Sequence, residues 1–243
     1  MRIIFSRKGF DSAAGGGPSP IVDGKPVTLP IPGAPECGTT YGSLGLGDHA
    51  AKASGGRYDG GSFCHHDPLF LRDGTCLFGQ VGAAQSHLAN QGVGPGDVFL
   101  FFGLFRKDRE APHHRIFGYL EVAGVVPLSG CDPVRLAEFA RHKHPHALWR
   151  EGKDDTVYEG RGSKASHASD ALRLSMPGSP PTIWRRPEWL RHGNLTYHRR
   201  PERWLSSGLL RSAPRGQEFV ADIADNDAAR DWLDVILTEI NRS

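Results

Sequence analysis

The sequence lacks three features: long apolar runs, paired cysteine motifs and a large excess of charge of either sign. A membrane-spanning helix needs roughly 20 apolar residues in a row, and the apolar run Ile3–Phe5 is far too brief for a secretory signal. The four cysteines have neither paired metal-ligand spacing nor a compact disulfide pattern. We therefore expect a cytoplasmic protein in a reducing compartment, with no membrane partner.

The near balance of charge also limits the function. The chain has 29 Lys and Arg residues against 27 Asp and Glu residues, which leaves a net charge of only +2. A typical duplex-binding module is strongly basic, so contact with nucleic acid has to be local. Segment 184–204 is the local candidate, because it interleaves basic and aromatic residues. Two interpretations of this segment stay open: a solvated basic face that its aromatic residues anchor to the core, and a face that binds a polyanion.

Glycine and proline are abundant, with 31 and 18 residues in a chain of 243. This composition predicts many turns and long irregular connections, while the apolar content is high enough for a real core. The length favours one elaborated domain over residues 1–243. We expect an α+β fold with a mixed or mostly antiparallel sheet, peripheral helices and long loops.

Four segments read as strands. Val98–Phe102 and Ile116–Val122 give the clearest β signals and most simply pair antiparallel. Arg2–Phe5 reads as a buried first strand, and Glu218–Ile223 as the last strand. The region from 151 to 201 is rich in turns and has no clear assignment.

Three segments read as helices. Pro133–Arg141 has Asp132 as its N-cap and proline at the first helical position. The other two are a helix over Gln80–Gln91 and a final helix that starts at Asp225-Asn226-Asp227. Spacing predicts the buried stripe of each: Val81, Ala84 and Leu88 in the first, with Gln85 off the core, and Ala228, Trp232, Val235, Ile236 and Ile240 in the second.

The first strand runs directly into a polar turn, Phe5–Ser12, which contains Ser6, Arg7, Lys8 and Ser12 beside Asp11. Two cations, two hydroxyls and free backbone donors suit a phosphate or a carboxylate. The glycine spacing of a Walker loop is absent. An anion site and a plain polar turn are both consistent with these residues.

Histidines gather in two further segments. In Cys64–Pro68, Asp67 can act as a base or fix a histidine tautomer. Adjacent side chains in an extended chain point to opposite faces, so at most one of the two histidines, such as His66, shares a site with other catalytic groups. His144 and His146 alternate and can face the same way. Such a pair can bind zinc if another ligand joins it from His65, His66 or Asp67. We prefer hydrogen-bonded catalytic or structural histidines and assign no metal ligand.

The last candidate segment, Arg215–Val220, leads into the final strand and carries Gln217 and Glu218. An amide can read the edge of a nucleobase, and a carboxylate can act in proton transfer. Because neighbouring strand residues point apart, we expect only one of the two to enter a site. A polar strand entry without a function explains the same residues.

Taken together, eight strings make the chain resemble the nucleotide modification associated domain 3 family. They are Phe5–Ser12, Ser19-Pro20, Leu29–Pro32, His66–Pro68, Gly79-Gln80, Gly94–Phe105, His144–His146 and Arg215–Val220. The resemblance covers nearly the whole chain and implies an association with DNA base-modification systems. It implies a nucleotide or nucleic acid as the ligand, and it supplies no reaction and no cofactor.

We expect an enzyme that acts on a base or nucleotide by group transfer or glycosidic-bond chemistry. Its expected roles are phosphate binding by Arg7 and Lys8, base catalysis by Asp11 or Asp67, proton transfer by His66, His144 or His146, and orientation of the base by Gln80 or Gln217.

Two alternatives remain open. The hairpin formed by Gly96–Phe102 and Gly118–Val122 is similar to the core hairpin of PUA-like barrels, which include EVE and ASCH domains. That similarity implies a non-catalytic reader of modified DNA or RNA, clamped by segment 184–204. The other alternative is a binder of a small nucleotide or sugar phosphate, which needs only Arg7 and Lys8.

Overall fold

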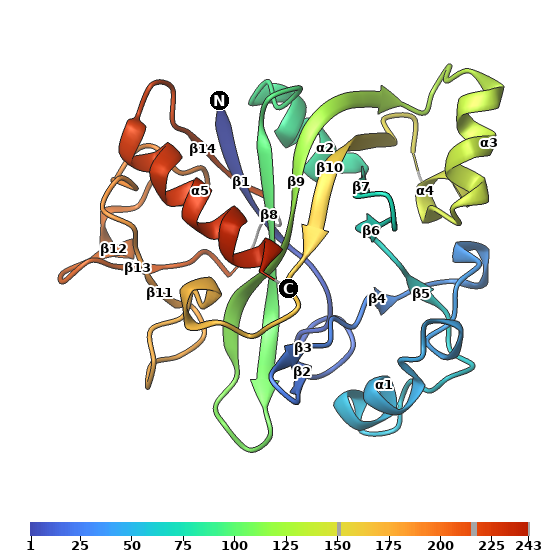
Figure 1. Ribbon diagram of the computed structural model, residues 1–243, viewed down its shortest axis with the longest axis horizontal. Coiled ribbons are helices and arrows are strands. Elements are labelled where there is room, and N and C mark those ends of the chain that lie inside the picture. The colour runs from blue at the N-terminus through green and yellow to red at the C-terminus, as the bar shows by residue number, and fades with distance from the viewer. Residues whose placement is uncertain (150–151, 215–217, 243) are drawn as a thin grey trace.

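The computed structural model describes residues 1–149, 152–214 and 218–242. Figure 1 shows a curled central sheet with helices around it, which confirms the α+β class. The sheet has nine strands: β1 (Arg2–Arg7), β2 (Ser19–Val22), β3 (Lys25–Pro26), β6 (Leu69–Phe70), β7 (Thr75–Gln80), β8 (Val98–Lys107), β9 (His113–Pro127), β10 (Thr156–Lys164) and β14 (Glu218–Asp222). Five α-helices are described: α1 (Gly47–Ser54), α2 (Gly82–Asn90), α3 (Pro133–Arg141), α4 (Pro145–Leu148) and α5 (Asp227–Asn241).

The strands run in the order β14-β1-β8-β9-β10-β7-β6, and β2 and β3 extend the sheet beside β8. Most neighbours are antiparallel, including the expected pair β8 and β9, while β8 runs parallel to β1 and β2. Two smaller sheets lie outside it. One pairs β4 (Ile31–Pro32) with β5 (Cys64–His65), and the other contains β11 (Ile183–Arg185), β12 (Trp204–Leu205) and β13 (Leu209–Arg211).

Both faces of the central strands are buried, which explains why β8 reads as a continuous apolar run. Leu100 and Phe102 lie in the same core cluster as Leu233 and Ile236 of α5, and this helix crosses one face of the sheet in Figure 1. Phe101, on the other face of β8, belongs to a second cluster that also contains residues of β1, β7, β9, β10 and β14. The second cluster therefore fills the concave side of the sheet.

The sheet curls far enough to bring its distant strands together. β14 and β7 are five positions apart in the strand order, which corresponds to about 24 Å in a flat sheet. Gln80 of β7 nevertheless donates from Nε2 to Oε1 of Glu218 in β14 over 2.6 Å. Curvature into a half-barrel therefore closes the sheet on a polar contact between these two residues.

Both predicted buried stripes are only partly right. Leu88 of α2 is buried as expected, as are Ile236 and Ile240 of α5, and Trp232 packs against the core. In α2, Gln85 is 8% exposed and its Oε1 accepts from the buried hydroxyl of Tyr158, because the helix turns this residue toward the concave side of the sheet. The actual helix also starts two residues later than predicted, so Gln80 belongs to β7. In α5, Val235 is 60% exposed, while Ala229, Leu233, Ile236 and Ile240 are buried. The packing of α5 on the sheet decides which side of the helix is buried, and the spacing of apolar residues alone does not predict it.

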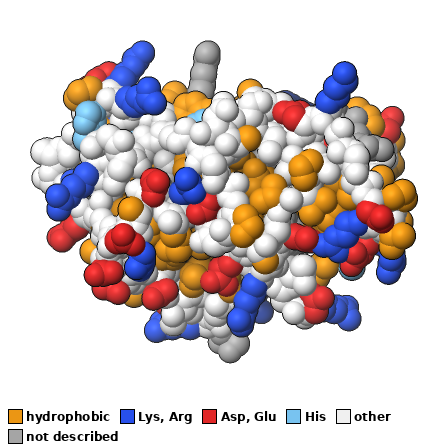
Figure 2. Space-filling view, turned by 90° about the horizontal axis from the view of Figure 1, so that it is seen from above, with side chains coloured by type: hydrophobic (Ala, Val, Ile, Leu, Met, Phe, Trp, Pro, Cys, Tyr) orange, Lys and Arg blue, Asp and Glu red, His pale blue; other side chains and the backbone are white. Residues whose placement is uncertain are grey.

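Other expectations on secondary structure fare better. The strand at the N-terminus, the final strand and α3 with its Asp132 cap are confirmed, each to within a few residues. The unassigned region contains the long strand β10. None of the helices among the described residues is long and apolar enough to cross a membrane. Figure 2 shows acidic and basic side chains interspersed over one face of the molecule, in keeping with the balanced composition.

Candidate functional site

A cavity of about 360 Å³ opens where the ends of β1 and β7 meet the chain around β5 and α4. Its wall includes Lys8, His65, Asp67, Gln80 and His146. These residues come from four separate segments, and the curl of the sheet brings Lys8 and Gln80 to the same carboxylate, Glu218. The volume lies in the range of small-molecule sites.

One side of the cavity rests on the buried carboxylate of Glu218. We call this residue and its partners Ser6, Lys8 and Gln80 the Glu218 cluster. Ser6 and Glu218 are direct neighbours across the β1–β14 pair. Glu218 is 1% exposed, and its Oε1 accepts from Ser6 Oγ at 3.1 Å, Lys8 Nζ at 3.0 Å and Gln80 Nε2 at 2.6 Å. Through these bonds Glu218 fixes the side chains of Lys8 and Gln80 at the cavity wall.

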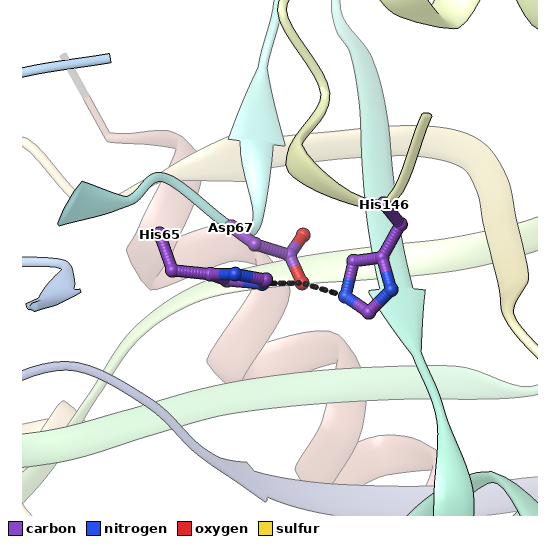
Figure 3. Close-up of side chains that lie close together, drawn as sticks. All are labelled: His65, Asp67 and His146. Carbon is purple, nitrogen blue, oxygen red and sulfur yellow. Dashed lines mark ion pairs between the residues drawn. The ribbon is translucent and has the colours of Figure 1, made fainter. Parts of the chain in front are cut away.

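The other side holds the His–Asp cluster, formed by His65, Asp67 and His146. Figure 3 shows one Asp67 oxygen between the two imidazoles. Oδ2 of Asp67 lies 3.9 Å from Nε2 of His65 and 3.9 Å from Nε2 of His146. These distances are too long for hydrogen bonds, so the three groups face a common point without bonding one another.

His146 is held from behind by a second carboxylate. Its Nδ1 lies 2.5 Å from Oδ1 of Asp155, and the two side chains are 4% and 0% exposed. A protonated Nδ1 that donates to Asp155 leaves the lone pair of Nε2 facing Asp67. The His146 ring packs directly against the backbone of Gly79, where only glycine fits, because a Cβ there would lie 2.2 Å from Cδ2 of the ring. The Gly79 amide donates to both oxygens of Asp67, at 3.1 and 3.2 Å.

Burial dominates the electrostatics of the His–Asp cluster. It raises the pKa of Asp67 to about 6, with the charges of His146 and Lys8 acting in the opposite direction. Burial, followed by the charges of His146 and Lys8, lowers the pKa of His65 to about 3. It also holds the pKa of His144 well below its usual value. His65 and His144 are therefore neutral at pH 7, and their ring nitrogens can act as ligands or hydrogen-bond acceptors.

The structure brings several of the predicted site residues together. Lys8, Asp67, Gln80 and His146 line the cavity, while Ser6 and Glu218 stand behind it as part of the Glu218 cluster. His144 is fully buried, with Nε2 3.6 Å from Oδ1 of Asp67, and neither of its ring nitrogens has a hydrogen-bond partner among the described residues.

The remaining predicted residues lie at the edge or elsewhere. Arg7 lines the cavity, but its guanidinium donates to the carbonyls of Ala213 and Pro214, so both terminal nitrogens already have partners. Asp11 also lines it and accepts from two backbone amides of its own turn. Ser12 is exposed.

His66 faces a neighbouring cavity that is lined by Phe70 and Lys164. Gln217 lies outside the described residues. Sequence reasoning offered His65 only as one of three possible zinc ligands, and it did not select Asp155. Asp155 follows Gly152 in a polar turn, and no spacing signal links that turn to His146.

Segment 184–204 offers few free aromatic faces. Trp184 and Trp189 are 2% and 5% exposed and belong to the core under α5. Arg185 pairs with Asp170, and Arg203 donates to backbone carbonyls. These contacts favour the interpretation of a basic face that its tryptophans anchor to the core.

The fold and the cavity define an α+β protein with a polar, histidine-rich site at the closure of a curled sheet. The chain belongs to the nucleotide modification associated domain 3 family, whose model matches residues 2–222 of its 243. No curated protein and no solved structure matches the chain. Membership associates the protein with nucleotide modification, as its sequence motifs had indicated.

Proposed function

We propose that the protein is an enzyme that acts on a nucleotide or on a base of nucleic acid within the cavity. One observation carries this proposal: the His–Asp cluster faces the same cavity as Lys8 and Gln80, whose side chains Glu218 holds from behind. Buried carboxylates and neutral histidines at one cavity are typical of reacting centres, since their environment shifts their pKa values. The family name supplies the ligand class.

The two clusters have different roles in this proposal. Lys8 and Gln80 contact the substrate: the ammonium attracts a phosphate, and the amide, which keeps a second N–H, binds an acceptor on the base or sugar. Glu218 is a positioning residue, since its Oε1 holds both of these side chains. The His–Asp cluster is the reacting centre, where group transfer or glycosidic-bond chemistry needs proton transfer.

A non-catalytic reader has less support. Such a protein stacks a base on exposed aromatic rings, whereas Trp184 and Trp189 are buried in the core. Binding without catalysis also does not require a buried carboxylate, here Asp155, that orients His146 toward Asp67. An enzyme uses both.

The test is the nucleoside composition of DNA from a host strain in which the gene is replaced by variants. Asp67→Asn keeps the shape of the side chain and removes its charge, and we expect the modified nucleoside to fall by about 100-fold, the usual effect of losing an acid–base group. The matched control is His142→Ala, because this exposed histidine follows α3 and lies outside the cavity. An unchanged level of modified nucleosides in Asp67→Asn would show that the cavity is not the reacting site.

A further inference from the structure

The His–Asp cluster has the geometry of a metal-ligand set. Its three ligand atoms lie within 4.8 Å of one another, and two of the separations are 3.9 Å. The point that is equally far from all three atoms lies at most about 2.5 Å from each of them. Bonds from zinc to a histidine nitrogen or a carboxylate oxygen are roughly 2.0 to 2.2 Å long. A contraction of a few tenths of an ångström therefore completes the coordination.

The orientation of His146 supports the same conclusion independently. Metal-bound histidines commonly donate their other ring nitrogen to a carboxylate, which fixes the tautomer and raises the basicity of the ligand. Asp155 stands in this position, 2.5 Å from Nδ1 of His146, and both side chains are buried. Nδ1 of His65 faces the Cys37 sulfur at 4.0 Å, which turns Nε2 of His65 toward Asp67.

The surroundings of Asp67 add a further argument. His144 is fully buried behind it, and among the described residues no hydrogen bond reaches either ring nitrogen of His144. Around Asp67 there are thus three imidazoles within 4 Å, and none is close enough for a hydrogen bond to it. A buried carboxylate surrounded by ring nitrogens that make no hydrogen bond to it is well suited to a cation.

We propose that the protein binds one divalent transition-metal ion through Nε2 of His65, Nε2 of His146 and the carboxylate of Asp67. Two imidazoles and one carboxylate are a donor set of catalytic zinc sites and of non-haem iron sites, both of which leave coordination positions open. Here the open positions face the cavity, where Lys8 and Gln80 lie. Metal binding does not depend on the proposed reaction, because it is measured without a substrate.

The experiment uses the full chain, stripped of metal with a chelator and titrated with Zn²⁺ alone by calorimetry and by competition with a chromophoric chelator. We expect one ion per chain. His65→Ala and Asp67→Asn each remove a ligand and should weaken binding by more than about 100-fold, and Asp155→Asn, which changes only the orientation of His146, by about 10- to 100-fold. His66→Ala is the matched control, because the adjacent histidine faces another cavity, and it should bind as the wild type does.

Circular dichroism establishes that each variant is folded, and His65→Ala keeps the test sharp because the His65 side chain is 19% exposed and tolerates truncation best. Substitution by Co²⁺ adds a spectroscopic readout, since its visible absorption reports the coordination geometry, and anaerobic Fe²⁺ distinguishes an iron site from a zinc site. Absence of saturable binding of all three ions overturns the proposal. Wild-type affinity in folded His65→Ala and Asp67→Asn overturns it equally.

Discussion

Gly79→Ala tests how closely the sheet and His146 are fitted together. The added Cβ would lie 2.2 Å from Cδ2 and 2.6 Å from Cγ of the His146 ring. Non-bonded carbons come to rest at about 3.5 Å, so the ring has to withdraw by more than about 1 Å. Metal–ligand distances tolerate only about 0.2 Å, so this withdrawal removes His146 from the ligand set. Loss of a residue that only supports a ligand weakens metal binding by about 10- to 100-fold. Because this variant displaces the ligand itself, we expect Zn²⁺ affinity to fall by at least about 100-fold.

Stability should change much less than metal binding in this variant. Forcing one methyl group into a packed site costs about 1 to 3 kcal/mol in the free energy of unfolding. The matched control is Gly94→Ala, since a Cβ at that position meets no atom within 4 Å. The assay pairs denaturant unfolding with chelator competition on both variants. Wild-type Zn²⁺ affinity in a folded Gly79→Ala protein would refute the placement of His146 in the site.

Three further predictions concern the rest of the fold. Glu218→Gln removes the charge that pairs with the ammonium of Lys8, whose side chain is 12% exposed, and should lower the free energy of unfolding by about 3 kcal/mol. Adding Lys8→Met should restore much of this loss; equal losses in the single and double variants would argue against the pair. Burial lowers the pKa of His114 to about 3, and its Nδ1 accepts from Trp184, so its stabilising effect is complete above the unfolded pKa of about 6.5 and is lost as the pH falls toward 3. Between pH 7 and 5 the free energy of unfolding of the wild type, measured with urea, should therefore fall by about 2 kcal/mol more than that of His114→Gln. Parallel plots of this free energy against pH for the two proteins would contradict the prediction. Asp132→Ala removes the N-cap of α3 and should cost about 1 kcal/mol, while Asp132→Asn, which keeps the acceptor, should cost only a few tenths; the same unfolding assay compares them.

Sequence reasoning worked best where local chemistry decides the structure. The apolar runs of β8 and β9 and the Asp132-Pro133 start of α3 are read directly from residue order. β10 was missed because its second half, Gly160–Lys164, carries glycine and basic residues in place of an apolar pattern. Its pairing with β9 and β7 supplies the stability that its own sequence does not predict.

The site was predictable in composition and not in arrangement. The motifs contained Lys8, Asp67 and His146, yet alternation along an extended chain was the wrong reason to expect His144 beside His146, because His146 lies in α4 and only His144 is extended. Asp155 and His65 become site residues through contacts between separate segments. The meeting of Gln80 with Glu218 depends on the curl of the whole sheet.

The central claim is that this cavity holds a nucleotide, and the binding of nucleoside 5′-monophosphates to the purified protein measures it most directly. We predict saturable binding of one nucleotide per chain in calorimetry. Lys8→Gln, which keeps a donor for Glu218 and removes the charge that meets the phosphate, should weaken it by about tenfold or more, since one charged hydrogen bond contributes about 1.5 to 3 kcal/mol. His142→Ala should leave it unchanged. Equal affinity in the wild type and Lys8→Gln, or no binding of any nucleotide, would contradict the account.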